Sequence, residues 1–585
     1  MPIINPGNLG DNIPPFGKRS TVLKRYVKLE NDRTSWRNHW MELSDYLIPR
    51  RGRFLFTTPN DRGKKRDNKI IDSTGTQALR TMSAGMMSGM TSPARPWFRF
   101  LTGDEETMDR HDVKVWLAQV ERVCRAILHK SNFYNVVFTV YSELGAFGTA
   151  PLYRQRHFDS VIRFRPFTAG EYVIAENDRG VVDTLGRSFT MTVSQIVEKF
   201  VIDSQRGLDD WHGVSRATRN LWNTKNYDSY VPVIHMIEPR RKAERDPHNF
   251  SNQHMPFKSV YMEQGAENDE VLFEGGFTRF PAYIPRWDVL QGDVYGRSPG
   301  MDALGDIKQL QQQQKRKAQA IDKMVNPPMT APTSLRGKPS SVLPGQTTYV
   351  DPLQGGQGFQ PAYQVTPRLA EMQQDIQEVQ ERIQRGFFAD LFAMMINSDR
   401  RQITATEVIE RQEEKLVLLG PVLQRLNVEL LDPLLDDVFD FALEADLLPD
   451  PPEVLQDVEL RVEYVSLLAQ AQQAVAASAL ERTLGFAGNL VAVFPDVVDN
   501  IDADEGMRQY AEILGNSPDL LRDSAQVAKI RADRAQQQQV AQAAEMAGQA
   551  AEMAGQAAQG AKVLSETDTQ NPNALTDLLG RGGTA

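Results

Sequence analysis

Two stretches of heptad-spaced residues decide the fold: GMDALGDIKQLQQQQKRKAQAIDKMV at Gly300–Val325 and LAEMQQDIQEVQERI at Leu369–Ile383. Apolar side chains and glutamines recur in both at alternating steps of three and four, the spacing of a helix–helix seam. We predict two helices, each about 40 Å long at most. They should pack along Leu304, Ile307, Gln311, Gln314, Ala318, Ile321 and Val325 of the first stretch and Leu369, Met372, Ile376, Val379 and Ile383 of the second.

The centre of the first seam is polar, because the run QLQQQQ places Gln311 and Gln314 at seam positions. A glutamine-centred seam makes a weak core within one chain, which favours packing against neighbouring copies. An ordinary antiparallel helix pair inside one globule is the alternative, and periodicity does not separate the two. Between the helices, residues 326–366 are rich in Pro, Gly, Ser and Thr and have no helical period, so they predict a small domain at the tip of a helical hairpin.

The regions around the two seams differ in character. Helical periodicity predicts helices over residues 21–47 and 112–128. Aromatic and β-branched segments then predict strands at residues 153–167, 172–174, 184–192, 233–237, 259–262 and 271–273, with a turn at Asn177–Gly180. After Ser298 the chain reads as almost entirely helical. The predicted fold class is therefore α+β, mainly α.

The carboxy-terminal half carries several helix signals. Thr404 and Glu407 form a capping box, and Gly420-Pro421 and Asp432-Pro433 predict irregularities in the helix that follows. Further helices are expected at 465–490 and 504–514. The last helix contains the repeat QAAEMAG at 542–548 and 549–555, a seven-residue period that predicts a helix with close neighbours. The alternative is a partly helical tail, since each glycine weakens a helix by about 1 kcal/mol. Residues 565–585 are expected to be disordered.

Charge is distributed unevenly along the 585 residues. The net charge is −10, yet Lys18–Lys69 carries fifteen Lys/Arg against six Asp/Glu, a local charge of +9. This basic region is suited to nucleic acid or an acidic partner; the alternative is a solvated face that pairs with acids elsewhere. Cys124 is the single cysteine, which excludes an intrachain disulfide and fits a reducing compartment. We expect its thiol to be buried on a helix.

Motifs for chemistry are absent from the sequence. It contains no GxxxxGK[ST] phosphate loop and no HExxH helix, and its eight histidines are scattered, so we predict no cofactor, no metal site and no enzyme activity. Ser298 lies in a formal GxSxG match, but Pro299 lacks the N–H that an oxyanion hole needs, so Ser298 is predicted to cap a helix. Asp502–Gly506 faintly resembles a calcium loop and is better explained as a helix start. The apolar run Met82–Thr91 is shorter than the roughly 20 residues of a membrane span, and no secretory signal is visible at the start of the chain.

Several segments together resemble one family, the head-to-tail connecting (portal) proteins of short-tailed bacteriophages. They are LRTMSAGMMSGMTSPARPWFRF at 79–100, VDTLGRSFTMTVSQIVEKF at 182–200, the PRW, YGR and NPP triplets within 280–328, TATE at 404–407 and LLAQAQ at 467–472. Each segment is weak alone, but they follow in order over most of residues 30–535. The QAAEMAG repeat is not part of the resemblance.

The resemblance implies a ring, usually of twelve subunits, at one capsid vertex. The implied domains are a mixed α/β wing at 1–296, stem helices at 297–326 and 367–397, a clip at 327–366, a tunnel loop with a kinked wing helix at 398–456, a helical crown at 457–564 and a tail at 565–585. Candidate tunnel-loop residues that line the DNA channel are Asp399, Arg400, Arg401 and Gln402. The stem seam positions, apart from Ala318 and Val325, become candidate subunit contacts.

The resemblance also implies function and partners. The ring would conduct double-stranded DNA without sequence preference during packaging and ejection. It would bind the terminase large subunit at the clip, tail adaptor or tail tube proteins, and major capsid and scaffolding proteins, in a virion assembled in the host cytoplasm. Arg400 and Arg401 are suited to contacts with DNA phosphates or, alternatively, to intersubunit ion pairs. Competing interpretations are another virion structural protein, such as a tail adaptor or scaffold, and a packaging nuclease or ATPase.

Overall fold

A computed structural model covers the chain and describes residues 19–49, 51, 69–202, 211–245, 251–267, 269–331, 333, 336–337, 359–362, 368–397, 419–455, 460–465, 480–489, 494, 502–513 and 520–566. The chain divides into two compact units. Unit 1 comprises Met1–Met108 and Trp116–Val475, and unit 2 comprises Asp109–Val115 and Ala476–Ala585. Helices and strands are mixed and helices predominate, as the sequence predicts.

The first helical segment of unit 1 is broken in two, which corrects the prediction of one helix over 21–47. Helix α1 spans Arg19–Asp32 and α2 spans Thr34–Tyr46. Between them Arg33 is buried and donates a hydrogen bond to the carbonyl of Tyr172. The interruption is limited to this residue, because the Arg33 N–H still donates to the Leu29 carbonyl and the Arg37 N–H to the Arg33 carbonyl.

Two further helices form the centre of unit 1. Helix α3 is Thr74–Met90, and the strongly buried α6 is Phe133–Phe147. Gly148 caps the carboxy-terminal end of α6, and its φ of 80° favours glycine. A Cβ at this position would lie 2.2 Å from the carbonyl oxygen of Gly296, so no larger residue fits without movement. Short α4 is Glu105–Asp109, and α5, predicted at 112–128, is His111–Lys130.

The predicted strands form two antiparallel sheets in unit 1. The predicted segment 153–167 is a hairpin of β2 (Leu152–His157) and β3 (Val161–Pro166), and β2 also pairs with β9 (Ala282–Tyr283). A five-stranded sheet has the order β4-β5-β6-β7-β8. Its strands are β4 Tyr172–Glu176, β5 Val182–Thr192, β6 Tyr230–Pro239, β7 Phe257–Glu263 and β8 Phe273–Phe277. The Asn177–Gly180 turn connects β4 and β5, and the Gly180 N–H donates to the Asn177 carbonyl.

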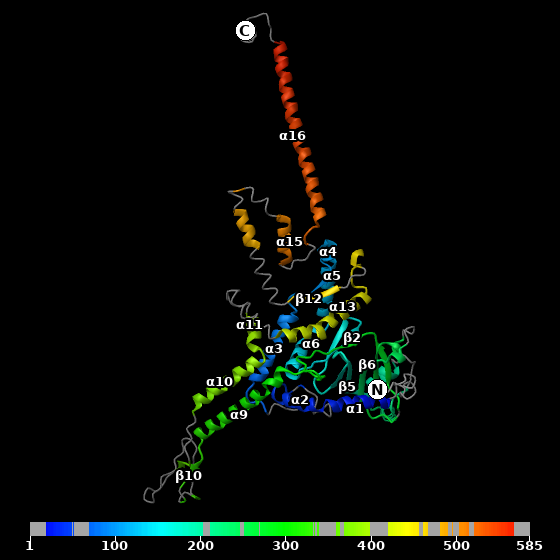
Figure 1. Cartoon of the computed structure of the whole chain (residues 1–585), viewed down its shortest axis with the longest axis vertical. Helices are drawn as coiled ribbons and strands as arrows, with labels where there is room; N and C mark the ends of the chain where they lie inside the picture. Colours follow the sequence, from blue (N-terminus) through cyan, green and yellow to red (C-terminus); the bar gives the residue numbers. More distant parts are fainter. Residues whose placement is uncertain are drawn as a thin grey trace, which may run out of the picture. The chain divides into compact units, whose positions relative to one another are not determined.

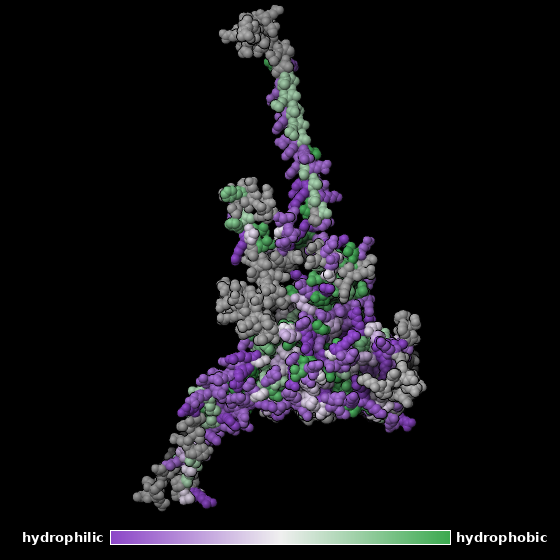
Figure 2. Space-filling model, in the orientation of Figure 1, coloured by the Kyte–Doolittle hydropathy of each residue, from purple (hydrophilic) through white to green (hydrophobic). Residues whose placement is uncertain are grey.

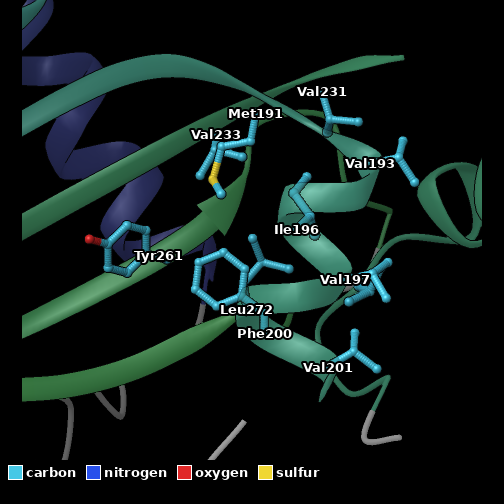
Figure 3. Close-up of a cluster of buried hydrophobic side chains, with 11 residues drawn as sticks. Met191, Val193, Ile196, Val197, Phe200, Val201, Val231, Val233, Tyr261 and Leu272 are labelled. Atoms are coloured by element: carbon cyan, nitrogen blue, oxygen red, sulfur yellow. The ribbon is translucent and has the colours of Figure 1, made fainter. Parts of the chain in front are cut away.

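Helices cover the five-stranded sheet with apolar side chains. Helix α7 (Val193–Val197) starts with a capping box of Thr192 and Gln195 and continues into a π-helical turn, η3 (Glu198–Ile202). Figure 3 shows its side chains packed with those of β5–β7. A second cluster joins α1 to the sheet; it contains Val22, Tyr26, Leu29, Val173, Ile234, Met236, Val260, Met262 and Val271. Helix α8 is Arg216–Asn223, and 3-10 turns lie at Lys242–Glu244 and Asn252–His254.

The remaining part of unit 1 is mainly helical. Helix α9 is Pro299–Val325, α10 is Leu369–Gly386, α11 is Ala389–Asn397 and α13 is Asp432–Glu444. A π-helical turn, η9 (Asn427–Leu431), precedes α13. This confirms the irregularity predicted at Asp432-Pro433, because Pro433 has no N–H to continue the helical hydrogen bonds. The predicted capping box at Thr404 and Glu407 lies outside the described residues.

One sheet of unit 1 joins distant segments and was not predicted. Strand β12 (Leu460–Tyr464) pairs antiparallel with β1 (Phe98–Thr102), so that Phe98 lies opposite Tyr464. A 3-10 turn at Glu453–Leu455 precedes β12. Beyond α9, the two-residue strands β10 (Met329–Thr330) and β11 (Gln360–Pro361) pair within the predicted clip.

The described part of unit 2 is helical. Helix α15 is Ala503–Ile513, and the Asp502 Oδ1 accepts the N–H groups of Asp504 and Glu505, which confirms a helix start here. Helix α16, Ser524–Glu566, has 43 residues and runs through both QAAEMAG repeats. Its apolar side chains, such as Met546 and Met553, are exposed (Figure 2).

Candidate functional site

Helices α9 and α10 form the helical hairpin that the seam predicts (Figure 1). Three polar contacts fix their antiparallel register: Arg382 ion-pairs with Asp306 at 3.1 Å, Gln313 donates to Asp375 at 2.5 Å, and Lys317 donates to Gln373. Ser298 caps α9, since its Oγ accepts the Met301 N–H at 3.0 Å and donates to the Ala146 carbonyl. The predicted capping role of Ser298 is confirmed, and both capping bonds occupy its hydroxyl.

The half of the pair nearest the rest of unit 1, called the inner half, is closed within the chain. Leu304 and Ile307 of α9 are buried there together with Ile376, Val379 and Ile383 of α10. The Ile307 side chain also reaches α3, where it lies 3.2 Å from the place that a Cβ on Gly75 would take. The apolar seam residues of the inner half therefore contact their own chain.

The glutamines of the seam form hydrogen bonds with a turn at Ile71 and Asp72, which the sequence analysis did not predict. The Gln311 Oε1 accepts the N–H groups of Ile71 and Asp72 at 2.6 and 2.8 Å, and its Nε2 donates to the Asp72 carbonyl at 2.9 Å. The Asp72 carboxylate accepts from Gln314 at 2.8 Å and from Gln380 at 2.9 Å. We call these four residues, Asp72, Gln311, Gln314 and Gln380, the Asp72 anchor.

Despite burial, the hydrogen bonds of the Asp72 anchor lower the pKa of the Asp72 carboxyl group. Burial raises the pKa of Asp72, but hydrogen bonds from Thr74, Gln314 and Gln380 to the charged form outweigh burial and hold the pKa below its usual value. Asp72 therefore joins α9, α10 and the start of α3 as an ionised acceptor at neutral pH. The alternative of a helix pair inside one globule describes this half of the seam.

The outer half of the pair, formed by the end of α9 and the start of α10, is more exposed than the inner half. Ile321, Met324 and Val325 are 39%, 47% and 79% exposed. Leu369 and Met372 opposite them are half-buried. Among the predicted subunit contacts, Leu304, Ile307, Gln311, Ile376, Val379 and Ile383 are buried in their own chain, Gln314, Leu369 and Met372 are half-buried, and Ile321 is exposed. A role between subunits stays a prediction, and it is open to the outer half.

The predicted channel residues are not described. Asp399, Arg400, Arg401 and Gln402 lie outside the described residues, as does most of the clip at 327–366. Helix α11 ends at Asn397, shortly before them. Their roles stay predictions.

The small-residue helix and the Ala-Arg-Pro-Trp segment serve packing. Gly85 of α3 is so close to Phe392 of α11 that a Cβ there would lie 2.3 Å from the Phe392 Cβ. Trp97 is buried and its Nε1 donates to the Tyr134 hydroxyl at 3.2 Å. This segment thus sets how α3 meets α11 and how the chain enters β1.

Two buried ion clusters tie the sheets to the helices around η9 and α13. Arg286 pairs with Glu176 at 3.0 Å and with Glu429 at 2.7 Å. Arg154 pairs with Asp437 at 2.5 Å, and the Tyr283 hydroxyl donates to the same carboxylate at 2.6 Å. Sequence analysis included Arg286 only as part of the Pro-Arg-Trp resemblance, and it gave no signal for the acids, which lie more than a hundred residues away along the chain.

Groups suited to metal binding do not gather in the described residues. Within them no three His, Cys, Asp or Glu side chains are placed to hold a metal ion. Cys124 is buried as predicted, and burial raises the pKa of its thiol to about 12. None of the described helices combines the length and hydropathy that crossing a bilayer requires.

Comparison with known proteins identifies the family. Residues 19–521 match the model of the bacteriophage head to tail connecting protein family. The chain is 45% identical over 567 residues to the portal protein of Salmonella phage epsilon15, covering 97% of this chain and 99% of that protein. It is 46% identical over 564 residues to the probable portal protein of Bordetella phage BPP-1, covering 96% and 98%.

Among solved structures, a chain described as the virion of a native gene transfer agent particle aligns with 70% of this chain and 95% of its own length. Its TM-score is 0.30 at 12% identity, which is too low to compare the folds. The family match spans most of unit 1 and continues into unit 2. On that match and the two relatives, the chain belongs to the bacteriophage head to tail connecting protein family.

Proposed function

We propose that this chain is the portal subunit of a bacteriophage head, a structural protein whose copies form a ring around an axial channel for double-stranded DNA. One observation carries the proposal: identity of 45% over 97% of the chain with a protein named portal protein. In this proposal the ring, of twelve copies by the family resemblance, conducts DNA in packaging and ejection and belongs to the virion after assembly in the host cytoplasm.

The charges of the helix pair support contacts between copies. Helix α9 carries five Lys/Arg and three Asp/Glu, whereas α10 carries two Lys/Arg and four Asp/Glu. A ring brings unlike faces of neighbouring copies together, because head-to-tail contacts use two different patches of the same subunit. The opposite net charges of α9 and α10, beside the exposed apolar residues of the outer half, suit such a contact.

The DNA path is proposed to be weakly adhesive. Duplex DNA carries about one negative charge per 1.7 Å of axis, so a channel lined with cations would grip it. Helix α10 presents Gln374, Gln377, Glu378 and Glu381 as exposed polar side chains. Arg400 and Arg401 are kept as candidate contacts with packed DNA, with an intersubunit ion pair as the alternative. Charge-neutral substitutions at both should lower DNA retention after packaging if they contact DNA.

We propose the partners from the family resemblance. The terminase large subunit would dock on the clip at 327–366, with tail adaptor or tail tube proteins, while major capsid and scaffolding proteins would surround the ring. Replacing 327–366 by a foreign clip should leave rings intact and abolish packaging. Loss of the rings themselves would contradict this assignment of the clip.

Electron microscopy of the purified full-length chain tests the proposal. We expect rings with an axial hole in negative stain, and a mass in solution that is a multiple of one chain. A stable monomer would contradict it. A chain that forms no ring alone, yet adds to the rings of another virion protein, would instead favour a tail adaptor or scaffold. Neither ATP hydrolysis nor DNA cleavage is expected from the purified protein.

A further inference from the structure

A cavity in unit 1 lies outside the helix pair and has no role in the proposed channel. Its volume is about 500 Å³, within the range of small-ligand sites. It opens between the β2–β3 hairpin and the end of β5, where β5 passes into α7 and η3. Its lining includes Arg165 of β3, Arg187, Phe189 and Met191 of β5, and Glu198 and Lys199 of η3. Figure 3 shows the apolar cluster that supports this wall, including Met191, Phe200 and Tyr261.

The most buried cation of the cavity is Arg187, which is 6% exposed. Its guanidinium carbon lies 4.2 Å from the ring centre of Phe189 and 4.9 Å from that of Phe167. No carboxylate of the described residues forms an ion pair with it; its guanidinium hydrogen-bonds to Tyr261, while its buried Nε has no hydrogen-bond partner among them. Burial lowers the pKa of Arg187 and neighbouring Arg165 lowers it further, while Tyr261 partly offsets both. A buried charge without a counter-ion is costly, so this arrangement favours an anion.

Two further cations, Arg165 and Lys199, line the cavity and are more exposed than Arg187. The Arg165 guanidinium lies 6.0 Å from the ring centre of Phe167. The Lys199 Nζ lies 4.4 Å from the ring centre of Tyr261 and 5.3 Å from that of Phe200. Neither cation pairs with an acid in the described part of the chain. Glu198 is the one acid in the lining, so three cations against one carboxylate leave a charge of +2.

We propose that this cavity binds a phosphate group. A phosphate carries close to two negative charges near neutral pH, which matches the charge of the lining. Its oxygens point in several directions and can accept from cations on three different elements, whereas a planar carboxylate offers two oxygens. Arginine binds such oxyanions through paired N–H donors, and these charge-assisted bonds are strong. The phosphate can come from two sources, free phosphate or a nucleotide, and the experiment below separates them.

Calorimetric titration of the full-length chain tests the site with inorganic phosphate, and then with dAMP, at constant ionic strength. We expect saturable binding of phosphate at one site per chain. Arg165→Gln and Lys199→Gln should each raise the dissociation constant for phosphate about tenfold, the loss of affinity expected for one charge-assisted hydrogen bond. Both side chains are substantially exposed, so these variants should fold, which circular dichroism checks. Arg163→Gln is the matched control on the same face of β3, outside the lining, and should change the constant less than twofold.

The outcomes test the proposal and identify the source of the phosphate. Tighter binding of dAMP than of phosphate assigns a nucleotide, and equal or weaker binding of dAMP assigns free phosphate. Absence of saturable phosphate binding to the wild-type chain overturns the proposal, as does equal weakening by Arg163→Gln. Ring formation in the presence or absence of phosphate tests the proposed portal function separately.

Discussion

The inner and outer halves of the α9–α10 pair share one heptad pattern but differ in what covers it. Ile307 and Val379 of the inner half are fully buried, while Ile321 and Val325 of the outer half are exposed. The inner half is closed by Gly75 of α3 and by Asp72, residues more than two hundred positions earlier in the sequence than α9. A seam pattern thus predicts that two helices pack, but distant segments decide whether its residues remain available to another copy.

The largest effect is expected where the seam is closed within the chain. Ile307→Ala should lower the free energy of unfolding by about 2–5 kcal/mol, since it opens a cavity between α9 and α3. Chemical denaturation of the isolated chain measures this. Ile321→Ala is the matched control on the same helix and should cost less than about 0.5 kcal/mol, as expected for an exposed site. Equal costs at the two positions would abolish the distinction between the halves.

A smaller loss is expected from the Asp72 anchor. Gln311→Met keeps the length of the side chain but leaves the N–H groups of Ile71 and Asp72 without their acceptor. An unsatisfied buried group costs about 1–3 kcal/mol, so the free energy of unfolding should fall by that order. Gln312→Met, at an exposed neighbouring position, is the matched control and should leave the free energy of unfolding nearly unchanged. A stabilising effect of Gln311→Met would mean that the polar centre of the seam is not held by the turn at Asp72.

Local signals predicted much of the fold. Periodicity placed α5, α9 and α10, and segments rich in aromatic and β-branched residues placed the strands of the main sheet. Ser298 and Asp502 were correctly predicted to start helices because capping depends on a few adjacent residues. Pro433 likewise indicated the irregularity at η9, because the missing proline N–H removes a helical hydrogen bond at that position.

Features that depend on distant partners could not be predicted in this way. The contact of Arg33 with the Tyr172 carbonyl and the pairing of β12 with β1 both join residues far apart in the sequence. Helical period alone gave no reason to stop at Asp32. Equally, the sequence marked Gln311 as polar at a seam position, but nothing local indicated that the turn at Asp72 would satisfy it. The candidate site was therefore predicted as a pair of helices, without its division into a closed and an open half.

Acid should weaken the inner half through Asp72. Hydrogen bonds to its carboxylate hold the pKa of Asp72 below its unfolded-state value. Its contribution is therefore present above the unfolded-state pKa of about 3.9 and is lost as pH falls through the lower folded-state pKa. Below about pH 4, the free energy of unfolding should fall more steeply for the wild type than for Asp72→Asn. Asp322→Asn, in the exposed outer half, should follow the wild type; coincident pH profiles of the wild type and Asp72→Asn would contradict this role of the anchor.

The smallest effect on folding is expected in the outer half, where the effect on assembly should be largest. Ile321→Ser with Val325→Ser removes exposed apolar side chains, so the free energy of unfolding of the single chain should change by less than about 0.5 kcal/mol. If a neighbouring copy covers them, their loss removes about 1.5–3 kcal/mol per buried side chain from each contact. Analytical ultracentrifugation should then show a lower ring fraction at equal concentration, while Gln319→Ser, at an exposed and uncharged position of α9 off the seam, leaves it unchanged. Intact rings from the double variant would place the contact between copies elsewhere, and the outer seam would then be an exposed face without a role in assembly.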